Sequence, residues 1–161
     1  MKTPRQKRSP TFGEEIDLLY LNLMKADVPY EEYKREFLKL EKHWLQRAKT
    51  TNQRLAVQRI IASLLLTEAY GARLPWKEFG PWIRRLQRLG FADLGMRVHV
   101  SCLYLQSLHR FPRQAREAWD MLDDAERRAL RLRRGRPLRE EHMRSITHAR
   151  KVAQVPRPPP R

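Results

Sequence analysis

The sequence predicts an all-α fold, a compact bundle of about six to eight helices with a basic N-terminal arm and a proline- and arginine-rich C-terminal tail. Two observations carry this prediction. Apolar residues recur at intervals of three and four along most of the chain, which is the spacing of amphipathic helices. Glycine is scarce, with six residues in 161, and the chain has few of the alternating Val and Thr residues that are typical of strands.

The first two helices follow from their caps and stripes. Thr11 and Glu14 fit a capping box, so a helix is expected from there to about Lys25. The next helix is expected over residues 30–49, where aromatic and leucine side chains repeat along one face. Because this spacing predicts burial, the stripe indicates a core rather than a platform for stacked bases.

The centre of the fold is expected between Thr51 and Cys102. This stretch contains the most apolar run of the chain, over residues 60–66, and a helix apolar on nearly all sides is buried on most of them. Thr50, with Thr51 and Asn52, is expected to cap this helix, which should end near Tyr70 before Gly71.

Proline, glycine and aspartate mark the later helix boundaries. Pro81 is expected at the first position of a helix that Gly90 closes, since proline fits a first turn. Asp123 or Asp124 is expected to cap a helix of its own. The remaining helices are expected over residues 92–110, 113–122 and 138–153.

Composition divides the chain into four parts. The helical core is expected over residues 11–134, between a disordered basic arm over residues 1–10 and a basic C-terminal helix over residues 135–154. Residues 155–161 are a tail of prolines and arginines, which should be extended.

The balance of charge favours an acidic polymer as partner. Lysine and arginine total 34 against 18 acidic residues, which gives a formal net charge of +16. Arginine far outnumbers lysine, and its planar guanidinium binds phosphate through two hydrogen bonds and stacks on bases. The alternative is that the bias reflects an arginine-rich proteome.

The candidate nucleic-acid-binding residues lie in three clusters. These are the N-terminal arm, the outer face of the helix after Pro81, where no acid shares the segment, and the region from residue 127 onward. They are Lys7, Arg8, Arg84, Arg85, Arg88, Arg127, Arg128, Arg131, Arg134, Arg136 and Arg139.

No catalytic, metal or cofactor site is expected. His99 and Cys102 are one helical turn apart, but two ligands do not make a metal site, and Cys102 falls on the apolar face. Asp120, Asp123 and Asp124 are better explained as helix caps than as magnesium ligands. The chain has no glycine-rich phosphate loop, and no nucleophile with a matching base stands out.

The function predicted from these features is non-enzymatic nucleic-acid binding, as a small subunit of a nucleoprotein complex with larger protein subunits. The charge would act through phosphates with little reading of bases, so RNA and DNA both remain open. The alternative is a helical adaptor that docks a protein partner, possibly acidic, with exposed Leu138 and Ile146 as its anchors. Arginines that form one uncompensated surface favour the first function, and arginines that are scattered or paired with acids favour the second.

Localisation is expected to be cytoplasmic, with association to a nucleoid or nucleoprotein as a variant. The single cysteine, Cys102, allows no intrachain disulfide, and the first residues lack the apolar core of a secretory signal. No run of about 20 apolar residues could cross a membrane, so no membrane partner is expected.

Overall fold

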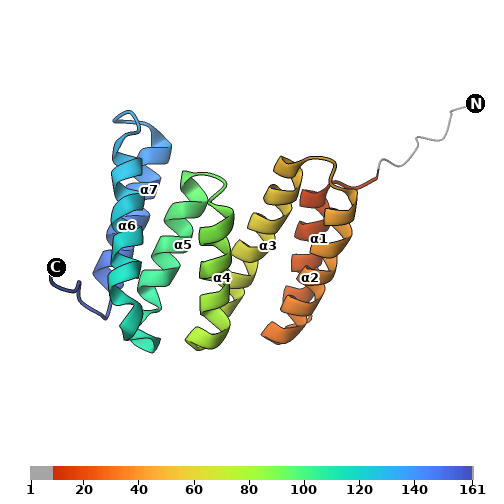
Figure 1. Ribbon diagram of the computed structural model, residues 1–161, viewed down its shortest axis with the longest axis horizontal. Coiled ribbons are helices and arrows are strands. Elements are labelled where there is room, and N and C mark those ends of the chain that lie inside the picture. The colour runs from red at the N-terminus through yellow and green to blue at the C-terminus, as the bar shows by residue number, and fades with distance from the viewer. Residues whose placement is uncertain (1–8, 161) are drawn as a thin grey trace, which may run out of the picture. The chain divides into compact units, whose positions relative to one another are not determined.

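The computed structural model describes residues 9–160, and this range contains seven α-helices, two short 3-10 helices and no strand (Figure 1). The prediction of an all-α fold is confirmed. Two compact units divide the chain, one ending at Val57 and the other beginning at Gln58. Of the predicted basic arm, residues 1–8, including the candidate residues Lys7 and Arg8, lie outside the described range.

The first unit is built on α1 (Phe12–Lys25) and α2 (Tyr30–Arg47). The predicted capping box is present, because the backbone N–H of Glu14 donates to Thr11 Oγ1 at 3.3 Å and the N–H of Thr11 donates to Glu14 Oε2 at 2.6 Å. Phe37 is fully buried on the predicted stripe of α2. The outer face of α2 carries charges of both signs, which pair as Arg35 with Glu32 and Lys39 with Glu36.

Helix α3 (Thr51–Gly71) contains the boundary between the two units. Its start is capped as predicted, since the N–H of Gln53 donates to Thr50 Oγ1 at 3.1 Å and the N–H of Thr50 donates back to Gln53 Oε1 at 3.2 Å. In the second unit, α3 buries Ile61 and Leu65 completely.

Helix α4 (Trp76–Leu89) begins five residues before Pro81, so the prediction that Pro81 opens the helix is wrong. Proline inside a helix removes one backbone hydrogen bond, and packing must compensate for it. The turn before Pro81 is held by a cluster of stacked and tilted rings, in which Trp76 lies 5.7 Å from Tyr104 and 5.2 Å from Phe111, centroid to centroid. Phe79 completes the cluster and is fully buried.

Helix α5 (Leu94–Gln106) is capped by Asp93 and leads through the 3-10 helices Leu108–Arg110 and Pro112–Gln114 into α6 (Ala115–Leu130). The predicted break at Asp123 and Asp124 does not occur. Helix α6 runs through both residues because its buried stripe is continuous, and their carboxylates pair with arginines instead of capping a helix. The stripe consists of Ala115, Ala118, Trp119, Leu122, Ala125 and Ala129.

Helix α7 (Pro137–Val152) returns along α5 and α6 and agrees with the predicted last helix to within a residue. His142 is buried, and Ile146 and Ala149 are completely enclosed. The tail over residues 153–160 then leaves the helix without regular secondary structure. No helix in the described range is long and apolar enough to cross a membrane.

Candidate nucleic-acid interface

The arginines of α4 have different environments, although the sequence suggested one uncompensated face. The Arg84 guanidinium pairs with both carboxylate oxygens of Glu117 on α6, and its Nη2 donates to Oε2 at 3.0 Å. Arg85 lies over the ring of Trp82 at 5.9 Å from its centroid. Arg88 is exposed, and no acid in the described range pairs with it. The expectation of uncompensated charge therefore fails for Arg84, because its acid lies 33 residues further along the chain.

Glu117 is the centre of a small polar network. Gln87 donates to its Oε1 at 2.6 Å, and the Tyr104 hydroxyl donates to its Oε2 at 3.1 Å. Partial burial pushes the pKa of Glu117 upward, but the hydrogen bonds from Arg84 and Gln87 outweigh it and leave the pKa below its ordinary value. Arg84 is thus committed to a structural role in holding α4 to α6.

Asp124 neutralises the start of the next arginine cluster. Its carboxylate accepts from Arg97 at 2.8 Å and from Arg128 at 2.9 Å, and it lies 3.6 Å from the guanidinium of Arg127. Although partial burial opposes ionisation, the hydrogen bond from Arg128 and the charges of these arginines lower the pKa of Asp124. One carboxylate thus faces three guanidinium groups.

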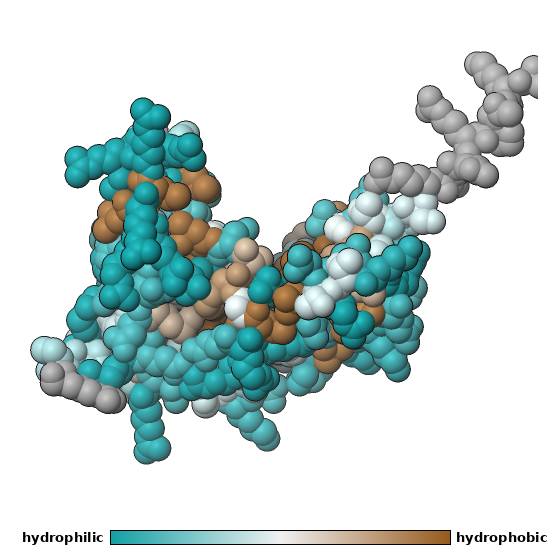
Figure 2. All heavy atoms as spheres, turned by 45° about the horizontal axis from the view of Figure 1, so that its top comes forward, coloured by the Kyte–Doolittle hydropathy of each residue, from teal (hydrophilic) through white to brown (hydrophobic). Residues whose placement is uncertain are grey.

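The loop between α6 and α7 carries four arginines without acid partners, which we call the arginine tip. All four side chains are exposed, and no ion pair or side-chain hydrogen bond involves them within the described range. Figure 2 shows hydrophilic side chains projecting from this end of the α6–α7 hairpin. The arginine tip consists of Arg131, Arg133, Arg134 and Arg136.

The backbone of the arginine tip is folded into a defined turn. The N–H of Arg136 donates to the Arg133 carbonyl at 3.3 Å, and Gly135 adopts a φ of 75°, which suits a residue without Cβ. Arg139, another candidate residue, is half-buried and donates to the Leu132 carbonyl at 3.1 Å. Arg139 therefore fixes the loop rather than adding a free charge to it.

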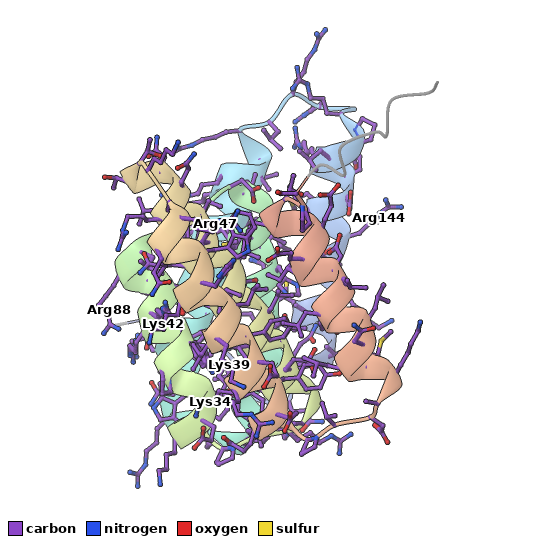
Figure 3. All side chains as sticks on the ribbon, turned by 90° about the vertical axis from the view of Figure 1, so that its right-hand side faces the viewer. Lys34, Lys39, Lys42, Arg47, Arg88 and Arg144 are labelled. Carbon is purple, nitrogen blue, oxygen red and sulfur yellow. The ribbon has the colours of Figure 1, made fainter. Side chains whose placement is uncertain are left out.

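The helix order brings the arginine tip to the same end of the second unit as the C-terminus of α4. Helices α4, α5, α6 and α7 alternate in direction, so the α4–α5 and α6–α7 connections lie at one end (Figure 1). Arg88 belongs to the last turn of α4, at this end. Arg144 on α7 projects to the opposite side from Arg88 (Figure 3), so the free cations do not form one face.

No protein-family model, curated protein or solved structure matches this chain. The case for a function therefore rests on the chain's own geometry.

The histidines and the cysteine offer no metal centre among the described residues. The hydroxyl of Thr67 lies 3.0 Å from His99 Nε2, which engages that nitrogen. Cys102 is buried, donates to the Ser145 carbonyl at 3.6 Å, and has a pKa raised to about 11 by burial. Such a thiol is a poor nucleophile near neutral pH, because the thiolate is the reactive form.

The anchors expected for an adaptor are not both available. Leu138 is 52% exposed beside the arginine tip, but Ile146 is fully buried between α7 and its neighbours, so the expectation of an exposed Ile146 is wrong. The helical stripe that contains Ile146 faces the core because α7 packs on α5 and α6. Sequence reasoning missed an exposed apolar stripe on α1, formed by Leu18, Leu21 and Met24.

A second site was also missed from the sequence, where the proline-rich tail lies on α6. Arg157 pairs with Asp123 through two hydrogen bonds of 2.6 Å, and the Trp119 indole N–H donates to the Val155 carbonyl at 3.3 Å. The signal available in the sequence was the spacing of Arg116, Trp119 and Asp123, which places them on one face of a helix.

Proposed function

We propose that this protein binds nucleic acid without catalysing a reaction, and that the arginine tip is its main contact with phosphates. The observation that carries the proposal is the division of the arginines in the second unit. Several of those within helices, such as Arg84, Arg128 and Arg150, face carboxylates, whereas the four in the α6–α7 loop face solvent with no acid partner in the described range. Leaving four like charges adjacent opposes folding, which suggests that an external anion neutralises them.

The chemistry of the arginine tip suits phosphates better than bases. Exposed guanidinium groups on a turn can contact successive phosphates and release their counterions. No described helix presents a set of side chains arranged to read base edges, so sequence-independent binding is expected. Arg88, exposed at the same end of the second unit, would extend the contact, and incorporation into a larger nucleoprotein complex would supply specificity.

Nucleic-acid binding should therefore weaken steeply as the salt concentration rises. This dependence on salt should become less steep when the arginines of the arginine tip are replaced by neutral residues. We expect the triple variant Arg131→Ala, Arg133→Ala, Arg134→Ala to bind a short DNA duplex at least tenfold more weakly at low salt. Each phosphate contact contributes about 0.9 to the slope of log K against log salt, so the slope should fall by about 3. Fluorescence anisotropy across a chloride series, repeated with single-stranded RNA, measures both quantities.

A second triple variant removes the same charge at the other end of the second unit. Arg73, Lys77 and Arg113 are exposed, and no acid in the described range pairs with them. Their replacement by alanine should change the slope by less than about 1. Equal losses in both triple variants would show that binding follows net charge alone, and a flat salt response in the wild-type chain would exclude phosphate binding.

A helical adaptor is the second candidate, and the apolar stripe on α1 favours it. Leu18 is 61% exposed, Met24 51% and Leu21 45%, and their spacing puts them on one side of α1. Exposed apolar stripes of this kind are frequent in protein–protein contacts. Purification from the host before and after nuclease treatment separates the two functions, because a protein partner docked on α1 stays bound after nuclease treatment. The variant Leu18→Asp should release such a partner.

A further inference from the structure

The C-terminal tail is an extended segment because its sequence allows little else. Prolines occupy positions 156, 158, 159 and 160, and proline fixes its own φ near −65° and restricts the residue before it to extended conformations. Such a segment has no internal hydrogen bonds, so its carbonyls are open to donors from outside. It also loses little conformational entropy on binding, since it is already ordered.

Helix α6 meets this tail with one stripe of side chains, which we call the α6 stripe: Arg116, Trp119, Asp120 and Asp123. Their spacing of three and four residues aligns them along the helix. The Trp119 indole N–H donates to the Val155 carbonyl at 3.3 Å, and Arg116 donates to the Pro159 carbonyl at 3.1 Å. Side-chain donors therefore hold two backbone carbonyls, four residues apart.

The arginine of the tail is recognised separately from its prolines. Arg157 makes two hydrogen bonds of 2.6 Å to Asp123 and lies over the Trp119 ring at 5.0 Å from its centroid. Arg150 of α7 donates to the same Asp123 at 3.1 Å, which fixes the carboxylate before the tail arrives. The Asp123 carboxylate and the face of Trp119 thus bind the arginine, and the Trp119 N–H binds the backbone of the segment that carries it. Together they form a preorganised receptor for an arginine within a proline-rich segment.

The tail does not fill this receptor. A hollow of about 350 Å³ remains beside it, lined by Arg116, Trp119, Asp120, Arg157, Pro158 and Pro160. Asp120 is exposed there, and no cation in the described range pairs with it, although the chain carries a net charge of +16. Arg157 is itself 51% exposed, so the attachment is open to exchange.

We propose that the α6 stripe is a docking site for an arginine-bearing proline-rich segment of a partner protein, and that the chain's own tail occupies it as a displaceable ligand. Extended proline-rich peptides are commonly recognised by surfaces lined with aromatic rings, and Trp119 supplies such a ring here. The acidic residues of α6 explain why a basic partner is accepted by a basic protein. This inference does not depend on nucleic-acid binding.

The test uses the chain of residues 1–161 and a fluorescent peptide that reproduces residues 154–161. In the wild-type chain the attached tail competes at an effective concentration in the millimolar range, so the added peptide should bind poorly. In Arg157→Glu the tail is repelled from Asp123, and the peptide should bind at least tenfold more tightly than to the wild type. Arg144→Glu, the same charge change at an exposed residue of α7, should bind as the wild type does.

Two altered peptides and one further variant define the recognition. A peptide with glutamate in place of its first arginine, and one with alanine in place of its four prolines, should each lose at least tenfold in affinity for Arg157→Glu. Adding Trp119→Phe to that variant removes the indole N–H and should weaken binding about fivefold. Three results would overturn the proposal. They are that Arg157→Glu does not bind the unaltered peptide, that the wild type binds this peptide as tightly as Arg157→Glu does, or that Arg157→Glu binds the alanine peptide as tightly as the unaltered one.

Discussion

At the scale of single residues, arginines that look alike in the sequence have opposite roles in the structure. Arg84 is tied to Glu117, which also accepts hydrogen bonds from Gln87 and Tyr104, whereas Arg133 has no acid partner in the described range. An acid close in space converts a potential binding group into a tie between helices. The difference lies in the neighbours of each guanidinium rather than in its charge.

Glu117 should therefore contribute measurably to stability. We expect Glu117→Gln to lower the free energy of unfolding by about 1–2 kcal/mol at pH 7, because it leaves Arg84 without a counter-ion; the partial exposure of both side chains keeps the loss modest. Urea unfolding monitored by circular dichroism measures it. Asp120→Asn on the same helix, whose carboxylate has no described partner, should change stability by less than about 0.5 kcal/mol.

The effect of Glu117→Gln should depend on pH in a defined direction. The folded-state pKa of Glu117 is lowered, so its stabilising contribution is present above the unfolded-state value near 4.5 and is lost as the pH falls through the folded-state value. The stability difference between wild type and variant should shrink as the pH is lowered below about 4.5. A difference that is constant down to pH 2 would show that Glu117 acts only through packing.

At the scale of secondary structure, α4 shows packing overriding helix propensity. A Cβ on Gly80 would lie 2.6 Å from the Trp76 ring, which is itself held against Tyr104 and Phe111. Alanine is better than glycine in a helix by about 1 kcal/mol, yet Gly80→Ala should destabilise the protein by about 1–3 kcal/mol, because the ring cannot move without disturbing the cluster. Thermal and urea unfolding measure this cost.

Gly71 provides the matched control for this prediction. It ends α3, and a Cβ there would meet nothing within 4 Å. Gly71→Ala should therefore be neutral or stabilise the protein by up to about 1 kcal/mol, through the lower entropy of the unfolded chain. If both variants have the same effect on stability, the contact between Gly80 and Trp76 has no energetic weight.

The sequence predicted helices well where local chemistry defines their ends. The capping box at Thr11 and the cap at Thr50 follow from neighbouring residues alone, and the start of α7 was predicted to within one residue. It failed at Pro81 and at Asp123, because buried contacts with other helices sustain α4 and α6 through residues that locally favour a break. Tertiary packing is invisible to a rule that considers a few adjacent residues.

The same reasoning explains what could be predicted of the sites. The arginines at residues 131, 134 and 136 were identified from the density of charge in the chain, and they are exposed in the structure. The pairing of Arg84 with Glu117 and of Arg157 with Asp123 joins residues more than 30 positions apart, which no count of neighbouring charges detects. The tail was expected to be extended, but its receptor on α6 required the fold.

At the scale of the whole molecule, charge is distributed unevenly rather than balanced. The chain has 34 basic against 18 acidic residues, and five of the acids lie within α6. Four of these acids, Glu117, Asp123, Asp124 and Glu126, pair with arginines of α4, α5, α7 and the tail. The arginine tip, at the end of that same helix, receives none of this compensation in the described range. Stability therefore combines attraction around α6 with repulsion elsewhere.

Salt should distinguish these two contributions, because it screens exposed charges more than partly buried pairs. The Arg97–Asp124 and Arg150–Glu126 pairs are partly buried, whereas the tip arginines are exposed, so added salt should relieve more repulsion than attraction. We expect Tm to rise by about 2–4 °C between low salt and about 0.3 M sodium chloride, in the absence of nucleic acid, which corresponds to about 1 kcal/mol for a domain of this size.

In the triple variant Arg131→Ala, Arg133→Ala, Arg134→Ala the rise in Tm should be smaller, since three mutually repelling charges are gone. A Tm that falls with added salt in the wild type would mean that the ion pairs around α6 dominate and that the tip arginines do not oppose folding. In that case the tip arginines would not need an external polyanion to neutralise them, and the proposal of nucleic-acid binding would lose its basis.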